Sequence, residues 1–299
     1  MTTTSEQFVS TLARTLAYSM RTPVLRRPDE VGLAYEDVTF PSMDGTPLEG
    51  WFIPADSDKL VIANHPMPCN RYGYPGHIEE FSFFADFEVN FLPDYKNLHD
   101  AGYNVLAYDL RNHGLSGAGN GGVVGIGLLE YRDVIGSLRY GRSRMNIDNS
   151  RIGLLSRCLG ADSTIVAMSK HPEEFENIRA MVAVQPVSLR PFVEVACETN
   201  GIPGGVEMFA KEIKNLTSFD LDELSPLSYA PDVQAPTFVI QVREDSSTRP
   251  SDVQGIYDAL GTQDKKLFWI EGTTRRFDGY NYFAQQPAQM LDWFNTHFA

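Results

Sequence analysis

The chain has 299 residues, of which 42% are hydrophobic and 11% are aromatic. This composition is sufficient for a large buried core and indicates a globular protein. The 25 Lys and Arg residues stand against 39 Asp and Glu residues, giving a formal net charge of -14. Such an acidic balance argues against nucleic acid or an anionic membrane as the main partner. We expect a small-molecule substrate, and the sequence leaves the oligomeric state open, a homodimer included.

The cysteines indicate neither a metal site nor a disulfide scaffold. Only Cys69, Cys158 and Cys197 occur, an odd number without the spacing of a zinc site. Free thiols are typical of a reducing compartment. The first 25 residues lack the basic start and continuous apolar run of a secretory signal. We therefore expect a cytoplasmic protein without metal or cofactor.

The chain begins with the pattern of an amphipathic helix. Over about residues 5–20, apolar side chains recur every four residues, at Phe8, Leu12, Leu16 and Met20. This spacing places them on one face of a helix, which the proline-containing segment 21–29 ends. We assign residues 1–30 to an N-terminal helical extension.

Beyond residue 34, short apolar strands alternate with helical segments. Residues 35–40 and 48–53 flank a turn and predict an antiparallel hairpin. Six further strands are expected at 60–63, 105–108, 152–155, 181–184, 237–241 and 267–270. Helices are expected at 91–101, 128–140, 161–169, 250–260 and 287–298. This order predicts an α/β fold with a doubly wound, mostly parallel eight-stranded sheet.

No linker divides the chain, so residues 1–299 are expected to form a single domain. One stretch departs from the alternation of strands and helices, residues 187–236, between the sixth and seventh strands. It contains a second amphipathic segment near 206–216. A connection of this length is usually functional, and we expect a helical cap over the carboxyl edge of the sheet.

The most informative motif is RIGLLSRCLGADS, residues 151–163. A buried strand enters a sharp turn with Cys158 at its apex, and Gly160 permits the close approach of strand and helix. The segment resembles the nucleophile turn of the α/β-hydrolase superfamily, G-x-S-x-G. Ser156 replaces the first glycine and Cys158 replaces the serine, as in the dienelactone hydrolases. The resemblance covers roughly residues 35–298 and implies a cysteine nucleophile.

Two further segments resemble the same superfamily and imply site residues. ANHPMPCNRYG after the third strand is similar to the oxyanion loop, so the backbone amides of Leu159 and of Met67 or a neighbouring residue are the expected oxyanion donors. QVREDSSTRP follows the seventh strand, where the family has its acid. Asp245 is the expected acid and Glu244 the alternative.

The histidine of the family is missing from WIEGTTRRFDGYNYF, where Arg275 aligns with it; a shift of one residue would place Arg276 inward instead. Arginine cannot accept a proton near neutral pH, because its pKa exceeds about 12. A thiol at a helix N-terminus beside a cation can nevertheless ionise without a base. We expect Arg275 to stabilise a Cys158 thiolate, with His65 and then His77 as candidate substitute bases. The aromatic residues Phe277, Tyr280, Tyr282 and Phe283 are expected to pack the last helix onto the sheet.

The resemblance implies a hydrolase acting through a cysteine nucleophile on an ester, lactone or thioester of a small apolar molecule. Because no base is evident to activate water, acyl transfer, cyclisation or a lyase-type reaction stays open beside hydrolysis. The alternative is a catalytically degenerate member of the fold that binds a ligand under the cap.

Overall fold

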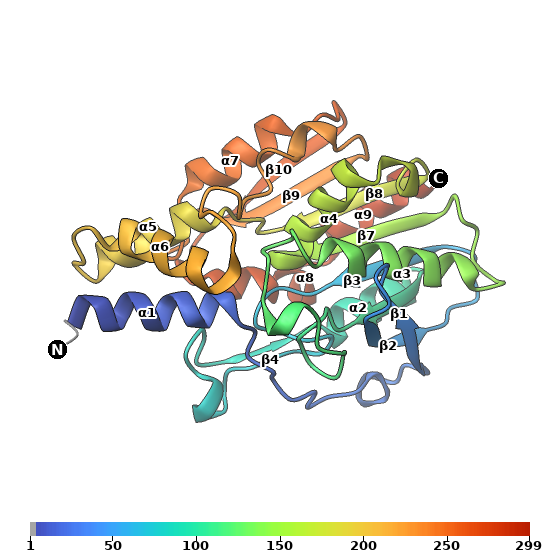
Figure 1. The fold of residues 1–299 in the computed structure, drawn as a ribbon. Coiled ribbons are helices and arrows are strands. Elements are labelled where there is room, and N and C mark those ends of the chain that lie inside the picture. Colours follow the sequence, from blue (N-terminus) through green and yellow to red (C-terminus); the bar gives the residue numbers. More distant parts are fainter. Residues whose placement is uncertain (1–3) are drawn as a thin grey trace.

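The computed structural model describes residues 4–299 and contains a central eight-stranded sheet (Figure 1). Its strands are β1 (Glu36–Pro41), β2 (Pro47–Ile53), β3 (Leu60–Asn64), β6 (Asn104–Tyr108), β7 (Ile152–Arg157), β8 (Ile178–Val184), β9 (Thr237–Val242) and β10 (Lys265–Ile270). They lie in the order β1-β2-β6-β3-β7-β8-β9-β10. β2 pairs antiparallel with β1 and with β6, and every later pair is parallel. The predicted doubly wound, mostly parallel sheet is confirmed.

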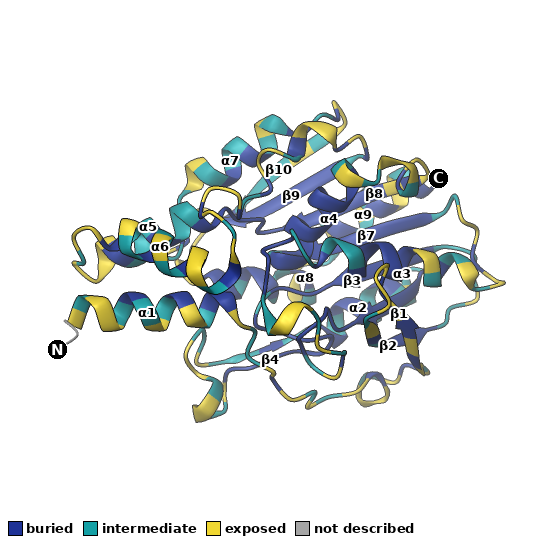
Figure 2. Cartoon of the chain, in the orientation of Figure 1, coloured by how far each residue is buried: buried dark blue, intermediate teal, exposed yellow. Residues whose placement is uncertain are grey.

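Helices cover both faces of this sheet. On one face lie α3 (Tyr131–Ser143), α4 (Leu159–Lys170) and α7 (Pro250–Ala259), and on the other α2 (Leu92–Asp100), α8 (Tyr282–Gln285) and α9 (Ala288–Phe298). Alternate strand residues contribute to the two cores: Leu60 and Ile62 of β3 face the first, and Val61 and Ala63 face the second. The central strands are therefore buried on both sides (Figure 2), which explains their continuous apolar sequence.

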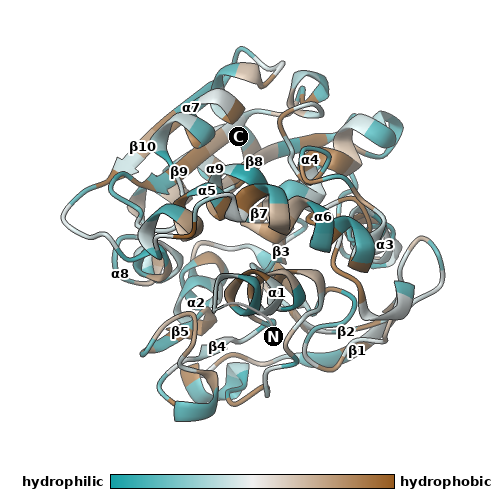
Figure 3. Ribbon diagram, turned by 60° about the vertical axis from the view of Figure 1, so that its left-hand side comes forward, coloured by the Kyte–Doolittle hydropathy of each residue, from teal (hydrophilic) through white to brown (hydrophobic). Residues whose placement is uncertain are grey.

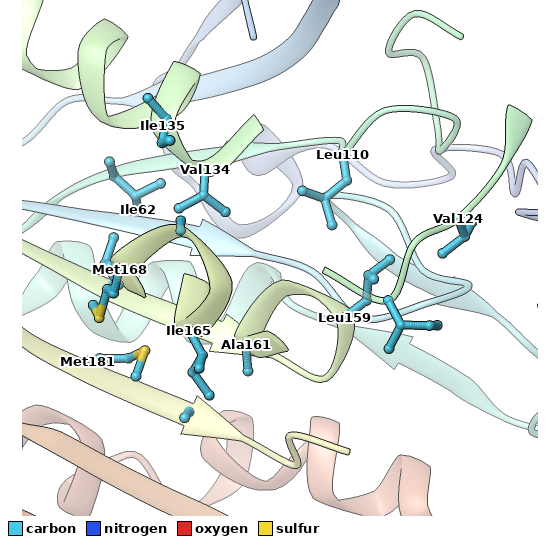
Figure 4. Packing of buried hydrophobic residues seen from close by; sticks show 14 of the residues in the cluster. Ile62, Leu110, Val124, Val134, Ile135, Leu159, Ala161, Ile165, Met168 and Met181 are labelled. Atoms are coloured by element: carbon cyan, nitrogen blue, oxygen red, sulfur yellow. The ribbon is translucent and has the colours of Figure 1, made fainter. Parts of the chain in front are cut away.

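Helix α4 is held in the core by its first three turns. Its residues from Leu159 to Met168 are all buried. Ile165 and Ala161 lie toward β8, while Leu159 lies near Leu110 and Val124 (Figure 4). A helix packed on all sides in this way has little freedom to shift, so its N-terminus is a rigid support for the turn before it.

Several elements escaped the sequence analysis. A small second sheet pairs β4 (Gly73–Pro75) with β5 (Glu88–Asn90), and α5 (Leu189–Thr199) precedes the expected amphipathic helix, which is α6 (Gly205–Thr217). Short 3-10 helices occur at η1 (Pro28–Val31), η2 (Glu79–Phe81), η3 (Asn120–Gly122), η4 (Pro172–Glu174), η5 (Ala230–Asp232) and η6 (Arg276–Tyr280). The 3-10 helices are too short to show a periodic apolar pattern, so the sequence alone does not mark them.

The N-terminal helix α1 (Thr4–Ala17) packs against α6. Figures 1 and 3 both show α1 alongside α5 and α6, which belong to the segment between β8 and β9. The start of the extension assigned to 1–30, residues 1–3, lies outside the described residues. None of the helices in the described range has the length and apolar character needed to span a bilayer.

Candidate active site

Cys158 lies at the sharp turn between β7 and α4. Its backbone has φ 46° and ψ -113°, an unfavourable conformation for a residue with a side chain. The turn is anchored because the Cys158 N–H donates to the Val184 carbonyl oxygen at 2.8 Å. Gly160 is required beside it, since a Cβ there would come within 2.6 Å of the Asn64 carbonyl oxygen. Cys158 is partly exposed, whereas Cys69 and Cys197 are buried.

The turn opens into a cavity of about 290 Å³. Most of the lining is apolar and comes from α1, the loop after β3, α5 and η6. The residues are Phe8, Leu12, Leu16, Met67, Phe83, Phe84, Ile126, Cys158, Leu159, Asp162, Val187, Leu189, Phe192, Ala196, Asn200, Ser247, Arg276, Phe277 and Tyr280. The N-terminal helix thus supplies part of the wall opposite the sheet. Phe277 and Tyr280 line this cavity, in addition to the packing role expected for them.

Arg276, at the start of η6, is the arginine that faces the cavity. Its side chain is 5% exposed, and its Nη1 donates to Asp245 Oδ2 at 2.7 Å. Its Nη2 donates to the Gln185 carbonyl oxygen at 2.6 Å, and its Nε donates to the Tyr280 hydroxyl at 3.0 Å. The guanidinium is therefore fixed on three sides by hydrogen bonds.

The Cys158 sulfur interacts with two of these groups. Burial would lower the pKa of Arg276, but the electrostatic interactions with Tyr280, Asp245 and Cys158, together with a hydrogen bond that the guanidinium donates to Cys158, raise that pKa well above its usual value. Burial, opposed by the charge of Arg276, raises the pKa of Tyr280 well above its usual value, and Cys158 raises it further. At neutral pH, Arg276 is thus a permanent cation and Tyr280 a neutral hydroxyl beside the thiol.

Asp245 follows β9 and orients this arginine. Its Oδ2 accepts hydrogen bonds from Arg276 and from Gln241 Nε2, the latter at 2.9 Å, and its Oδ1 accepts from the Ser247 N–H at 2.8 Å. Glu244, the alternative acid, is exposed and does not line the cavity. Of the two carboxylates considered, only Asp245 meets the arginine.

Arg275 does not occupy the position expected from the sequence. Its side chain is 60% exposed and forms a salt bridge with Asp278 at 2.8 Å. Arg275 precedes η6, whereas Arg276 is its first residue, and the turn directs consecutive side chains apart. Arg276, and not Arg275, is therefore the inward side chain.

The candidate substitute bases are not available at the sulfur. His65 is buried, with its Nδ1 2.9 Å from the Pro66 carbonyl oxygen and its Nε2 accepting the Leu110 N–H at 2.9 Å. Burial lowers the pKa of His65 to about 4, so it is a neutral ring with both nitrogens engaged. His77 is exposed and is absent from the cavity lining. Neither histidine is placed to replace the missing base.

The two expected oxyanion donors come from the start of α4 and from the loop after β3. Leu159 is the first residue of α4, so its N–H has no carbonyl partner within the helix. Met67 lies in the turn closed by the Cys69 N–H, which donates to the Pro66 carbonyl oxygen at 2.9 Å. Both residues line the cavity beside the thiol. Across residues 4–299, no group of three or more His, Cys, Asp or Glu side chains could hold a metal ion.

Sequence reasoning missed two polar residues of the site. Gln185 has a positive φ of 55° and holds η6 through its Nε2, which donates to the Arg276 carbonyl oxygen at 2.7 Å. Asp162 lies one helical turn after Cys158 and lines the same cavity. The usable signal for Asp162 was its place in the first turn of the helix that follows Cys158. Nothing in the local sequence marks Gln185.

Comparisons with known proteins agree with this architecture. No protein-family model matches the chain. Two curated Escherichia coli proteins, each described as an uncharacterized 31.7 kDa protein in the traX-finO intergenic region, are 22% identical over 247 residues. The match covers 69% of this chain and 85% of each relative.

Three solved structures illustrate the likeness of fold. The esterase Pf2001 of Pyrococcus furiosus is 22% identical with a TM-score of 0.72, covering 95% of this chain and 98% of that one. An acetyl xylan esterase from Paenibacillus sp. R4 is 18% identical with a TM-score of 0.63 and coverage of 99% and 96%. The α/β hydrolase GrgF from Penicillium sp. sh18 is 17% identical with a TM-score of 0.63 and coverage of 89% and 99%. The chain therefore has the α/β-hydrolase fold.

Proposed function

We propose that the protein is an enzyme of the hydrolase type in which Cys158 attacks the carbonyl carbon of an ester, lactone or thioester. The observation that carries the proposal is the position of the partly exposed thiol, at the apex of the strand-to-helix turn and beside a buried cation. The helix N-terminus and the fixed guanidinium both present positive charge to this sulfur, which is the environment typical of reactive cysteines.

Arg276 replaces the family histidine in a different chemical role. It remains charged and cannot remove a proton, so it stabilises a preformed thiolate where a histidine would generate the nucleophile. Asp245 holds the guanidinium in place, and the Tyr280 hydroxyl accepts the Arg276 Nε–H, which leaves the hydroxyl proton free for the sulfur. The three groups together support a nucleophile that needs no proton transfer before attack.

The oxyanion formed by this attack would be bound by the amides of Leu159 and Met67. A donor of this kind typically contributes about 2.7–4 kcal/mol to transition-state stabilisation. The apolar lining favours an uncharged acyl group, and a cavity of about 290 Å³ suits a small molecule. Two of the structural neighbours are esterases, which is consistent with this substrate class.

The proposal is tested by the reactivity of the thiols. Iodoacetamide at pH 6, followed by peptide mass spectrometry, should label Cys158 much faster than a free thiol, while Cys69 stays unlabelled because it is fully buried. Incubation with p-nitrophenyl acetate or butyrate should release p-nitrophenol and add one acyl mass, absent in Cys158→Ala. If Cys158 is inert to both reagents, the nucleophile is refuted and a ligand-binding member of the fold becomes the better interpretation.

A further inference from the structure

Asp162 is the carboxyl group nearest to the nucleophile along α4. It lies in the first turn of the helix, and its N–H donates to the Cys158 carbonyl oxygen at 2.8 Å. Both Cys158 and Asp162 line the cavity. The loop before α3 packs against the backbone of this turn, since a Cβ at Gly127 would come within 2.9 Å of the Asp162 carbonyl carbon.

Only one of the two carboxyl oxygens is engaged. Asp162 Oδ1 accepts the Val187 N–H at 3.1 Å, whereas Oδ2 is buried and has no hydrogen-bond partner among residues 4–299. The residue has no exposed surface. A buried carboxylate oxygen without a partner is costly, so this group is either protonated or reserved for a ligand in the cavity.

The charged surroundings favour the protonated form. Burial raises the pKa of Asp162 well above its usual value, and the negative charge of Cys158 raises it further. Asp252 of α7 acts in the same direction, while Arg276 of η6 and the Val187 N–H act in the opposite one. Asp162 is thus a neutral acid in the resting cavity, which Cys158 also lines.

We infer that Asp162 is the general acid and base of the acyl-transfer cycle, the function that no histidine of the site can perform. The inference rests on the proposed nucleophile. In acylation, the Cys158 sulfur bonds to the carbonyl carbon, the carbon–oxygen bond to the leaving group breaks, and the Asp162 carboxyl proton passes to that oxygen. The products of this half-reaction are an alcohol, a thioester and an Asp162 carboxylate.

Deacylation reverses the proton transfer. The Asp162 carboxylate accepts a proton from water, the water oxygen bonds to the acyl carbon, and the carbon–sulfur bond breaks. Cys158 leaves as a thiolate, which Arg276 stabilises, and Asp162 is again a neutral acid. A second alcohol in place of water would give acyl transfer by the same steps. General acid–base catalysis of this kind typically contributes 10²–10⁴-fold.

The test is Asp162→Asn, which keeps an oxygen for the Val187 N–H and removes the exchangeable acid. We expect Cys158 alkylation by iodoacetamide to stay within about threefold of the unsubstituted enzyme, while hydrolysis of the p-nitrophenyl acyl-enzyme slows by roughly 10²–10⁴-fold. The thioester should then accumulate in intact-mass spectra. The rise of the deacylation rate with pH, which reports ionisation of the carboxyl, should also disappear.

Asp252→Asn is the matched control, because Asp252 accepts the next backbone amide, Ser188 N–H at 2.8 Å, but does not line the cavity. It should leave deacylation within about threefold of the unsubstituted enzyme. Asp162→Ala provides a second variant, in which added formate should restore deacylation by supplying a carboxylate. Asp162→Asn deacylating at the original rate, or formate without effect on Asp162→Ala, would overturn the role of Asp162 and leave the nucleophile intact. Absence of any acyl-enzyme in the unsubstituted protein would instead refute the proposed function.

Discussion

Arg276 and Asp245 form a salt bridge of 2.7 Å in which the two side chains are only 5% and 1% exposed. A buried ion pair of this kind is not strong evidence for stability, because desolvation offsets the attraction between the charges. Its retention beside a partly exposed thiol is better explained by chemistry. A cation held in a fixed position lowers the free energy of the thiolate without requiring any movement during the reaction.

Replacing Arg276 by Gln should impair both reactivity and folding. Cys158 alkylation at pH 6 should slow by at least about tenfold, since the thiolate loses its cation. The free energy of unfolding in urea should fall by about 3–5 kcal/mol, because Asp245 is left buried and uncompensated.

Two controls accompany this variant. Arg275→Gln makes the same chemical change at the exposed neighbour and should alter neither quantity appreciably. The double variant Arg276→Gln/Asp245→Asn removes both charges and should regain part of the lost stability while its alkylation remains slow. Rapid alkylation in the double variant would show that the thiolate does not depend on Arg276.

Replacing Cys158 by Ser should remove catalysis, in contrast to enzymes that have a serine and a histidine. A hydroxyl requires a base to become nucleophilic; Arg276 cannot act as one, and the Asp162 carboxyl is protonated before acylation. We expect kcat for p-nitrophenyl butyrate to fall by roughly three orders of magnitude or more. Urea unfolding should change little, because oxygen replaces sulfur at a partly exposed position. Substantial turnover by Cys158→Ser would contradict this prediction, because it would mean that a group in the resting site accepts the serine hydroxyl proton.

The sequence predicted the sheet well because its parallel strands are buried on both faces and read as short apolar runs. It also placed Cys158 at the strand-to-helix turn, since a turn between a buried strand and a glycine-containing helix start leaves a local pattern. The choice between Arg275 and Arg276 depended on where η6 begins, and the ends of short elements are poorly marked in sequence. Gln185 reaches Arg276 across 91 positions of the chain, so no local pattern reveals it.

The sequence also could not predict which segments form the wall of the cavity. The stripe of Leu12 and its neighbours predicted a helix correctly, but an amphipathic pattern does not say which surface the apolar face meets. In the structure α1 packs on α6, and three of its apolar residues line the cavity beside the thiol. The N-terminal helix α1 is therefore part of the site only through its tertiary packing.

Shortening a side chain of α1 should therefore change substrate preference. Leu12 lines the cavity and is partly buried, so Leu12→Ala should enlarge the acyl-binding space. A buried methylene is worth about 0.8 kcal/mol, or roughly fourfold in kcat/KM. We expect the ratio of kcat/KM for p-nitrophenyl octanoate to that for acetate to rise by about tenfold. Arg14→Ala, on the exposed side of the same helix, should leave this ratio unchanged, and an equal shift in both variants would contradict a direct role of Leu12.

The raised pKa of Asp162 predicts how stability depends on pH. Burial, followed by the charge of Cys158, raises the pKa of this carboxyl in the folded protein, whereas the unfolded chain has an ordinary value near 3.9. Below that value both states bind the proton and the group has no effect. Above it the unfolded state releases the proton first, so the folded protein loses up to about 1.4 kcal/mol per pH unit until the folded pKa is reached.

Asp162→Asn removes this loss and should be more stable than the unsubstituted protein at pH 7 but not at pH 3.5. At each pH the measurement is the urea unfolding free energy of Asp162→Asn minus that of the unsubstituted protein. Comparing this difference at the two pH values cancels the contributions of other buried acids. Asp222→Asn is a control of opposite sign, because the side-chain hydrogen bond from Arg190 lowers the pKa of Asp222 and its contribution is lost as pH falls. Since that pair is exposed, its effect should be small. An Asp162→Asn variant whose relative stability does not change with pH would mean that Asp162 is ionised in the folded protein, and therefore has no proton to give a leaving group.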